Sequence, residues 1–149
     1  MPATTTYSFA DVIFIISHPS LGRYSAQGTG LGSITVTMST DRTAHDVAAD
    51  GSIMISKIEG NNGTIALQIQ QTSGFNAWLV NAYDYLVSAD PSEWAQMAVT
   101  IRSVSSGNLI NATGVSFQNR AELPLQSQGQ QRTWNLMASS ITETVVPTY

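Results

Sequence analysis

The stretch TAHDVAADGSIMISKIEGNNGTIALQIQQT, residues 43–72, decides the fold class of this chain. Near its end, Ile65, Leu67 and Ile69 alternate with small or polar residues, so that one face of a strand would be apolar and the other polar. This two-residue period is typical of antiparallel strands that cover a core with one face only. The stretch therefore predicts β-structure.

Two turn signals divide the same stretch. The Asp50-Gly51 pair favours the positive φ angles of a type I′ hairpin turn, and an Asn-Asn-Gly sequence follows at 61–63. Together they predict a three-stranded antiparallel meander whose strands cover residues 43–49, 52–57 and 64–72.

The pattern continues outward in both directions. A Gly107-Asn108 turn predicts a hairpin between two further strands, and residues 19–32 and 124–131 are rich in Gly, Ser or Gln and are predicted to be loops. The strand over residues 7–17 is dense in apolar residues, which predicts burial on both faces. The other predicted strands outside the meander cover residues 33–38, 97–104 and 109–117 and the segment around Trp134.

One segment has helical spacing instead. Ser73 is placed to cap a helix over about residues 75–87, and the sequence at 90–93 predicts a second, single-turn helix start with a capping box completed by Glu93. The apolar stripe of the longer helix consists of Phe75, Trp78, Leu79, Ala82 and Leu86.

The predicted fold class is mainly β, an antiparallel β-sandwich or small β-barrel with one flanking α-helix. At 149 residues, the chain has the size of one domain. We therefore expect a single domain over 1–149, with flexible or interface-forming termini at about 1–5 and 143–149.

Composition and charge exclude several function classes. Charged residues make up only 11% of the chain, against about 25% in an ordinary soluble domain. This suggests a surface that becomes covered by assembly. The net charge is −4 and the six basic residues are scattered, which disfavours a surface that grips nucleic acid or an anionic membrane. The apolar run at 12–16 is too short for a signal peptide or a membrane span.

The sequence offers little for chemistry. There is no cysteine, and His18 and His45 are the only histidines, each expected at the surface or in an interface. No serine lies in a nucleophile elbow, and no spacing of acids or histidines matches a zinc or calcium site. We predict no catalytic, cofactor-binding or metal-ligating residue and no enzymatic activity.

The order of several short motifs resembles a family of bacteriophage structural proteins, the major tail tube proteins of contractile, myovirus-type tails. These proteins are related in fold to the tube protein of the type VI secretion system. The resemblance covers about residues 7–140. The matching segments are YSFADV at 7–12, GSITV at 32–36, ADGSIM at 49–54, GTI at 63–65, QTS at 71–73 with Asn76, GVSFQ at 114–118, and the late strand containing Trp134.

The resemblance implies a subunit that self-assembles into stacked hexameric rings, the inner tail tube through which phage DNA is ejected. It implies a sheath protein outside the tube, a tape-measure protein inside it during assembly, and baseplate and tail-terminator proteins at its ends. DNA would pass through the lumen without specific binding, which fits a negative subunit because like charges repel. No membrane is implied. The location would be the virion tail, assembled in the host cytoplasm.

The turn region offers candidate contacts between subunits or rings, although the same residues also fit an interpretation as solvated turn charges, since exposed ion pairs contribute only about 0–1 kcal/mol each. The candidates are Asp41, Arg42, Asp46, Asp50, Gly51, Lys57 and Glu59.

Two alternative functions stay open at this stage. The chain also fits the tube component of a type VI or related contractile injection system, which shares the fold. A carbohydrate-binding β-sandwich module is the other alternative, and it would need exposed aromatic side chains. A hydrolase ranks third.

Overall fold

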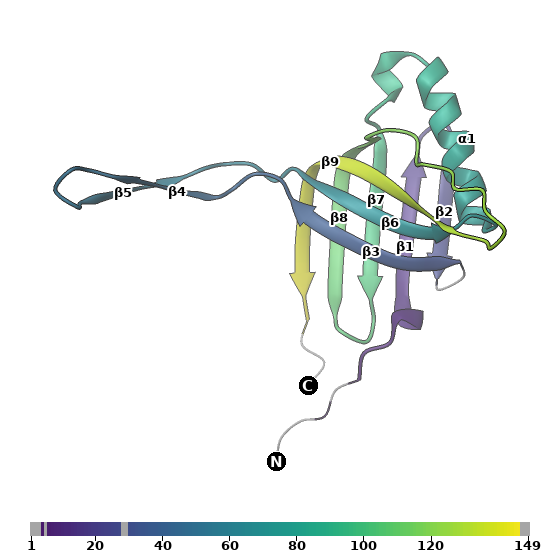
Figure 1. The fold of residues 1–149 in the computed structure, drawn as a ribbon, viewed down its shortest axis with the longest axis horizontal. Coiled ribbons are helices and arrows are strands. Elements are labelled where there is room, and N and C mark those ends of the chain that lie inside the picture. The colour runs from purple at the N-terminus through teal and green to yellow at the C-terminus, as the bar shows by residue number, and fades with distance from the viewer. Residues whose placement is uncertain (1–3, 5, 28–29, 147–149) are drawn as a thin grey trace.

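The computed structural model describes residues 4, 6–27 and 30–146, and these form a seven-stranded antiparallel sheet, a two-stranded sheet and one α-helix (Figure 1). The strand order in the large sheet is β2-β1-β7-β8-β9-β6-β3. The strands are β1 (Val12–His18), β2 (Gly22–Gln27), β3 (Leu31–Met38), β4 (Thr43–Val47), β5 (Ile53–Lys57), β6 (Gly63–Gln70), β7 (Met97–Ser103), β8 (Asn108–Phe117) and β9 (Gln131–Val145). The helix is α1 (Gly74–Ser88).

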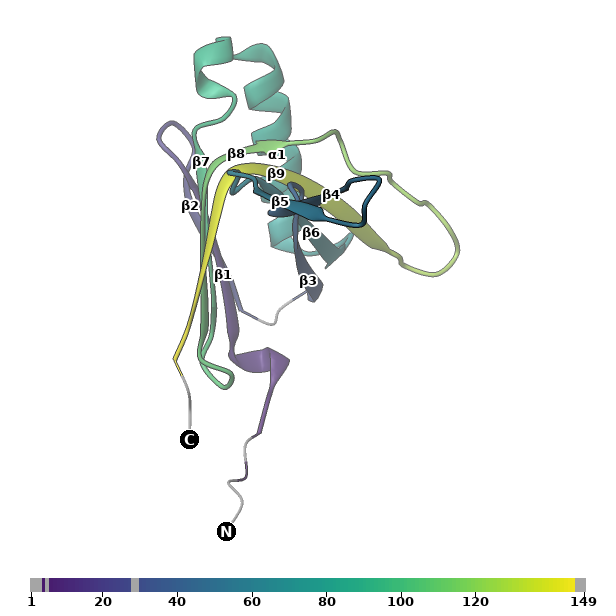
Figure 2. The same cartoon turned by 90° about the vertical axis from the view of Figure 1, so that its left-hand side faces the viewer.

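Strand β9 joins the two layers of the fold. Its first half pairs with β6, from Gln131 opposite Gln70 to Ala138 opposite Gly63, and its second half continues along β8 to Val145. Figure 2 shows this strand bending out of the layer of β3 and β6 into the layer of β1, β7 and β8. One sheet is thereby folded over itself, which confirms the predicted mainly β, antiparallel fold with one flanking helix.

The core lies between these layers and beneath α1. Ile65, Leu67 and Ile69 of β6 are completely buried, as their alternation predicts, and Trp134 and Leu136 of β9 meet them across the sheet. Among the described residues, every buried side-chain nitrogen or oxygen has a hydrogen-bond partner. The body of the molecule therefore satisfies both its apolar and its polar interior groups.

Helix α1 follows its sequence signals closely. The Ser73 hydroxyl caps it by accepting from the backbone N–H of Asn76 at 3.2 Å. The apolar stripe faces the core, although Trp78 is only half-buried. The buried members of the stripe are Phe75, Leu79, Ala82 and Leu86.

The second helix start forms only a 3-10 turn, Pro91–Glu93, and its predicted capping box is wrong. The Glu93 carboxylate instead accepts from the hydroxyls of Ser20 at 2.6 Å and Tyr85 at 3.1 Å. The Glu93 carboxylate therefore binds residues from other parts of the chain instead of capping the turn, as its local spacing predicts.

Two further predictions are corrected at the N-terminal end. The predicted loop 19–32 contains β2 and the start of β3, because a half-exposed edge strand rich in Gly, Ser and Gln lacks a clear apolar alternation. The predicted strand 7–17 begins only at Val12, after a 3-10 turn at Phe9–Asp11. One face of β1 is buried, and the other is half-buried rather than fully covered.

The predicted three-stranded meander over 43–72 is wrong. Strand β5 pairs only with β4, while β6 lies between β3 and β9. The chain leaves the large sheet after Met38, which lies opposite Gly63 in the β3–β6 register, and returns at Asn62. Residues 39–62 are therefore an excursion from a β3–β6 hairpin, and local turn signals do not distinguish such an excursion from a meander.

The predictions for the termini fall partly outside the described residues. Residues 143–145 form the end of β9, whereas residues 1–3, 5 and 147–149 lie outside the described part. No helix in the described part is both long and apolar enough to cross a membrane.

Candidate interaction surface

Residues 39–62 form an arm that projects from the body of the molecule (Figure 1). The arm consists of β4, β5 and the segments that connect them to β3 and β6. All residues of β4 and β5 are exposed, and the two strands pair only with each other. An isolated two-stranded ribbon is marginally stable in water, so an exposed ribbon of this kind points to an external partner.

The tip of the arm is a tight turn closed by Asp50. The backbone N–H of Ala48 donates to the Ser52 carbonyl at 2.8 Å, and Gly51 adopts a φ of 88°. Among the described residues only glycines have positive φ, so the tip is a three-residue turn with a left-handed glycine and not the predicted type I′ turn. The Asp50 carboxylate accepts from the Ser52 hydroxyl at 2.7 Å and its N–H at 3.0 Å, and these bonds lower the pKa of Asp50.

The base of the arm is braced by charged side chains. Arg42 approaches the Glu59 carboxylate at 3.2 Å and donates to the Ile58 carbonyl at 3.3 Å and to the side chain of Asn61. Lys57 lies 3.7 Å from the other oxygen of Glu59. These contacts join the two strands where the arm leaves the body.

The seven candidate contact residues all lie on the arm, but in separate places. Arg42, Lys57 and Glu59 meet at the base, while Asp50 and Gly51 form the tip. Asp41 and Asp46 make no salt bridge within the described part of the chain. Their role in contacts between subunits stays a prediction.

An apolar face of the arm is the feature that sequence reasoning missed. Val47 lies opposite Ile53 and His45 lies opposite Ile55, so these four side chains share one face of the ribbon. Val47, Ile53 and Ile55 are 65%, 56% and 67% exposed. The other face carries Asp46 opposite Met54. A cluster of three exposed aliphatic side chains on a ribbon indicates a binding surface.

The sequence does carry a signal for this face. Ile53 and Ile55 alternate within the segment 52–57, as they would in a strand that covers a core. The polar residues on 43–47 are the distinguishing signal, because a ribbon whose first strand contributes only Val47 to its apolar face cannot close a core alone.

The large sheet also has two unpaired edges. Strand β2 pairs only with β1, and β3 pairs only with β6. An unpaired edge strand offers a row of N–H and C=O groups to a second chain. The two edges and the arm are the parts of the described structure best suited to association.

The two histidines do not form a catalytic centre. His18 is buried rather than at the surface, which corrects the expectation for it. Its Nε2 lies 2.9 Å from the Glu93 carbonyl, and its Nδ1 accepts from the Ser20 N–H at 3.0 Å. His45 lies on the arm. The described residues contain no group of three or more acids or histidines that could hold a metal ion.

The tryptophans serve the interior. Trp134 is fully buried and donates its Nε1–H to Asn76 at 3.2 Å. Trp78 and Trp94 are half-buried against the core. In the described part of the chain, no tryptophan therefore offers the flat exposed platform that a carbohydrate-binding module needs.

The sequence profile of a family described as "Bacteriophage PhiTE tail tube protein" matches residues 4–145. No curated protein sequence matches the chain.

Several solved structures share the fold. The anti-feeding prophage cap, described as a tube terminating cap, aligns with a TM-score of 0.61 and 12% identity over 98% of this chain and 95% of that chain. A subunit of the anti-feeding prophage baseplate, 6-fold symmetrised, gives 0.62 and 10% over 98% and 97%. A subunit of the sheath–tube complex of the extracellular contractile injection system PVC gives 0.57 and 14% over 89% and 88%.

Proposed function

The chain belongs to the PhiTE tail tube protein family of bacteriophages, and on that premise we propose that it assembles into hexameric rings that stack into the inner tube of a phage tail. It is a structural component of the tail tube and not an enzyme. In the proposed virion, DNA passes through the lumen during ejection. A sheath protein surrounds the tube, a tape-measure protein occupies it during assembly in the host cytoplasm, and baseplate and terminator proteins close its ends.

The observation that carries this proposal is the arm. It holds three exposed aliphatic side chains on a ribbon that makes no sheet contact with the body of its own molecule. Burying such side chains contributes about 1.5–3 kcal/mol each relative to exposure. A subunit that docks its arm on a neighbouring ring thereby gains stability in the assembled state.

The unpaired edges support closure into rings. Strands β2 and β3 end the large sheet on either side, so a neighbour within a ring can extend the sheet at each edge. Ring closure removes the edges that would otherwise invite irregular association. The number of subunits depends on the angle between neighbours, and the six-fold symmetry of the similar baseplate structure supports six.

The charge of the chain supports the role of a DNA conduit. Six copies at −4 each give a strongly negative ring, and like charges keep DNA from adhering to the wall. The sheath–tube complex and the terminating cap among the similar structures support a sheath outside the tube and a terminator at its end.

An injection-system tube is the second candidate function, because the similar structures come from contractile injection systems. The family match to a phage protein favours the virion. Neighbouring genes for a capsid and a portal would support the phage tail, whereas effector genes in their place would support the injection system.

Electron microscopy of the purified protein, with a mass measurement in solution, tests the proposal. We expect hollow rings or tubes with six-fold end views at high protein concentration. A monomer at every concentration, also in the presence of the matching baseplate, would contradict the proposed function.

We also propose that the seven charged and turn residues on the arm contribute to contacts between rings. Reversing all three charges, with Arg42→Glu, Lys57→Glu and Glu59→Lys, keeps opposite charges beside residue 59 but changes the charges that a neighbour meets. We expect shorter-lived tubes with a lifetime that depends on salt concentration. Tubes as long and as durable as those of the parent would refute this role.

A further inference from the structure

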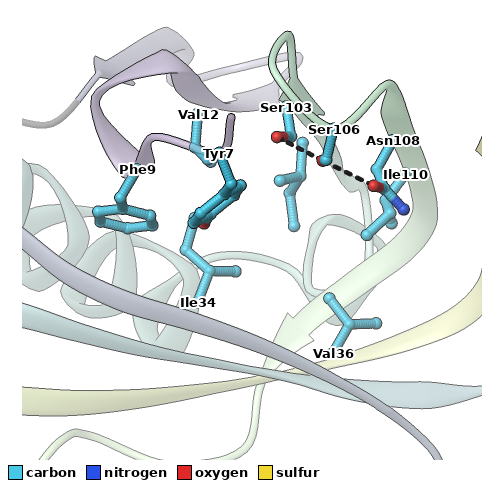
Figure 3. A pocket seen from close by; sticks show the side chains of 10 residues that line it. Tyr7, Phe9, Val12, Ile34, Val36, Ser103, Ser106, Asn108 and Ile110 are labelled. Carbon is cyan, nitrogen blue, oxygen red and sulfur yellow. Dashed lines mark hydrogen bonds between the residues drawn. The ribbon is translucent and has the colours of Figure 1, made fainter. Parts of the chain in front are cut away.

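The body carries an open apolar groove on the side where β3 leaves the core uncovered (Figure 3). The groove has a volume of about 280 Å³ and is lined by side chains from the N-terminal turn, β1, β3, β7 and β8. The ring of Tyr7 lines it together with the apolar side chains of Phe9, Val12, Ile34, Val36, Ile101 and Ile110.

The groove exists because β3 is an edge strand. Ile34 and Val36 point from β3 toward the core, but no strand pairs with β3 on its outer side, and both side chains stay half-buried. A second hollow of about 330 Å³ shares Val36 and Ile110 with the groove and reaches Arg42 and Asn61 at the base of the arm. The apolar opening therefore continues along β3.

The three polar side chains at the end of the groove formed by β7 and β8 are hydrogen-bonded to each other. The Ser106 hydroxyl lies 2.7 Å from the Ser103 hydroxyl and 2.7 Å from Oδ1 of Asn108, as the dashed lines in Figure 3 show. An apolar occupant that displaces water from this groove therefore leaves few polar groups without a hydrogen-bond partner.

We propose that the groove receives the apolar face of the arm, Val47, Ile53 and Ile55, from a second copy of this chain. This inference rests on the proposed function, because it names the surface that one tube subunit offers to another. It differs from the charge-based contacts above in making burial of aliphatic side chains the main source of affinity.

The arm of the same molecule does not fill its own groove. It extends away from the body at the end of β3, whereas the groove lies between β3 and the N-terminal turn (Figures 1 and 2). A contact between two different surfaces of identical chains is heterologous, so each subunit binds one neighbour and is bound by another. Such contacts propagate along a tube.

Charge beside the groove matches the apolar face of the arm. Glu143 lines the second hollow, next to Val36 and Ile110, and makes no salt bridge in the described part of the chain. Lys57 lies opposite Thr43 in the ribbon, on the same face as Val47, Ile53 and Ile55. A docked arm brings this ammonium group toward the Glu143 carboxylate, which favours a second copy over an unrelated apolar segment.

The absence of cysteine makes a direct test possible. Single cysteines are placed on the arm face (Val47→Cys, Ile53→Cys, Ile55→Cys) and in the groove (Ile34→Cys, Val36→Cys, Ile110→Cys). Each arm variant is mixed with each groove variant, assembled and mildly oxidised, and joined peptides are identified by mass spectrometry. We expect disulfides between arm and groove, because only residues in contact satisfy disulfide geometry.

Met54→Cys is the matched control, because Met54 is 62% exposed on the opposite face of the same ribbon. We expect it to give no joined peptide with the groove variants. Ile55→Glu should weaken assembly by roughly a hundredfold or more, because a buried carboxylate is costly, whereas Met54→Glu should change it by less than about threefold.

The outcomes separate this inference from the proposed function. Tubes that form without any arm–groove disulfide in all nine combinations, or with equal yield from Met54→Cys, would overturn the inference and leave the tube intact. Failure of the unmodified chain to assemble would contradict both.

Discussion

The body and the arm of this molecule differ in whether their apolar side chains are buried within the same chain. In the body, Trp134, Leu67 and their neighbours are completely inaccessible to solvent. In the arm, every residue of β4 and β5 is exposed, including three aliphatic side chains on one face. Both regions are antiparallel strands with apolar alternation. The difference shows that apolar alternation in the sequence identifies which face of a strand becomes buried. It does not show whether the residues that bury this face come from the same chain.

The largest expected effect comes from removing the arm. The Ser39 N–H donates to the Asn62 carbonyl at 3.0 Å, so residues 40–61 can be replaced by an Asn-Gly turn that closes the β3–β6 hairpin. We expect a folded monomer with nearly parental thermal stability and complete loss of assembly. Calorimetry and electron microscopy measure both properties.

The replacement also tests whether the body folds independently of the arm. An unfolded product would show that the arm stabilises its own body. A product that still forms tubes would show that the edges of the sheet are sufficient for assembly.

A pair of truncations sharpens the comparison. Leu67→Ala removes a fully buried side chain from the body and should lower the free energy of unfolding by about 2–5 kcal/mol. Ile55→Ala removes an exposed one and should change the stability of the monomer by less than about 0.5 kcal/mol while weakening assembly. Denaturant unfolding and light scattering distinguish the two effects. Equal losses of monomer stability would contradict the separation of body and arm.

Sequence periodicity predicted the parts whose partners are local or fully buried. Helix α1 was predicted within one residue at each end because Ser73 and the apolar stripe are local signals. Strand β6 was predicted because its alternation is complete. The arm was misassigned because a turn at 61–63 looks the same whether the chain pairs back or returns from an excursion.

The candidate site was predicted only in part, for a related reason. Turn chemistry located the tip at Asp50 and Gly51, and charged residues drew attention to the whole segment. The groove at Ile34 and Val36 was not predictable, because it depends on β3 being an edge of the sheet. That position follows from long-range pairing, which no local pattern encodes.

Substitutions of two glycines, one in the body and one in the arm, should have smaller effects on stability. A Cβ on Gly63 would lie 2.5 Å from the Thr37 carbonyl oxygen and 2.7 Å from the side chain of Ile141, so Gly63→Ala should destabilise the body by about 1–3 kcal/mol. A Cβ on Gly51 meets nothing within 4 Å, but an alanine held at the φ of 88° would be strained by about 1–2 kcal/mol. We expect Gly63→Ala to lower the thermal midpoint and Gly51→Ala to fray only the arm, as amide exchange reports. The reverse pattern would contradict this assignment.

The smallest effect concerns two Asp-x-Ser turns, one in each region. The pKa of Asp50 at the arm tip is lowered mainly by the hydroxyl of Ser52, and the pKa of Asp90 in the body is lowered mainly by the backbone N–H of Ser92. A folded-state pKa below the unfolded value gives stability that is present above the unfolded pKa. That stability is lost as pH falls through the folded pKa. Both turns should therefore loosen only below pH 4 or so, since an unperturbed Asp titrates near about 3.9.

Removing each hydroxyl separates the two turns. Ser52→Ala takes away the largest cause at the arm tip and should raise the pKa of Asp50 toward its ordinary value. Ser92→Ala leaves the main backbone donor in place and should shift the pKa of Asp90 less. Carboxyl titration by NMR measures both pKa shifts in the monomer with its arm intact. If Ser92→Ala shifted Asp90 more than Ser52→Ala shifts Asp50, the arm tip would be held chiefly by its backbone. The turn at the tip would then owe its shape to the same kind of contact as the turn in the body.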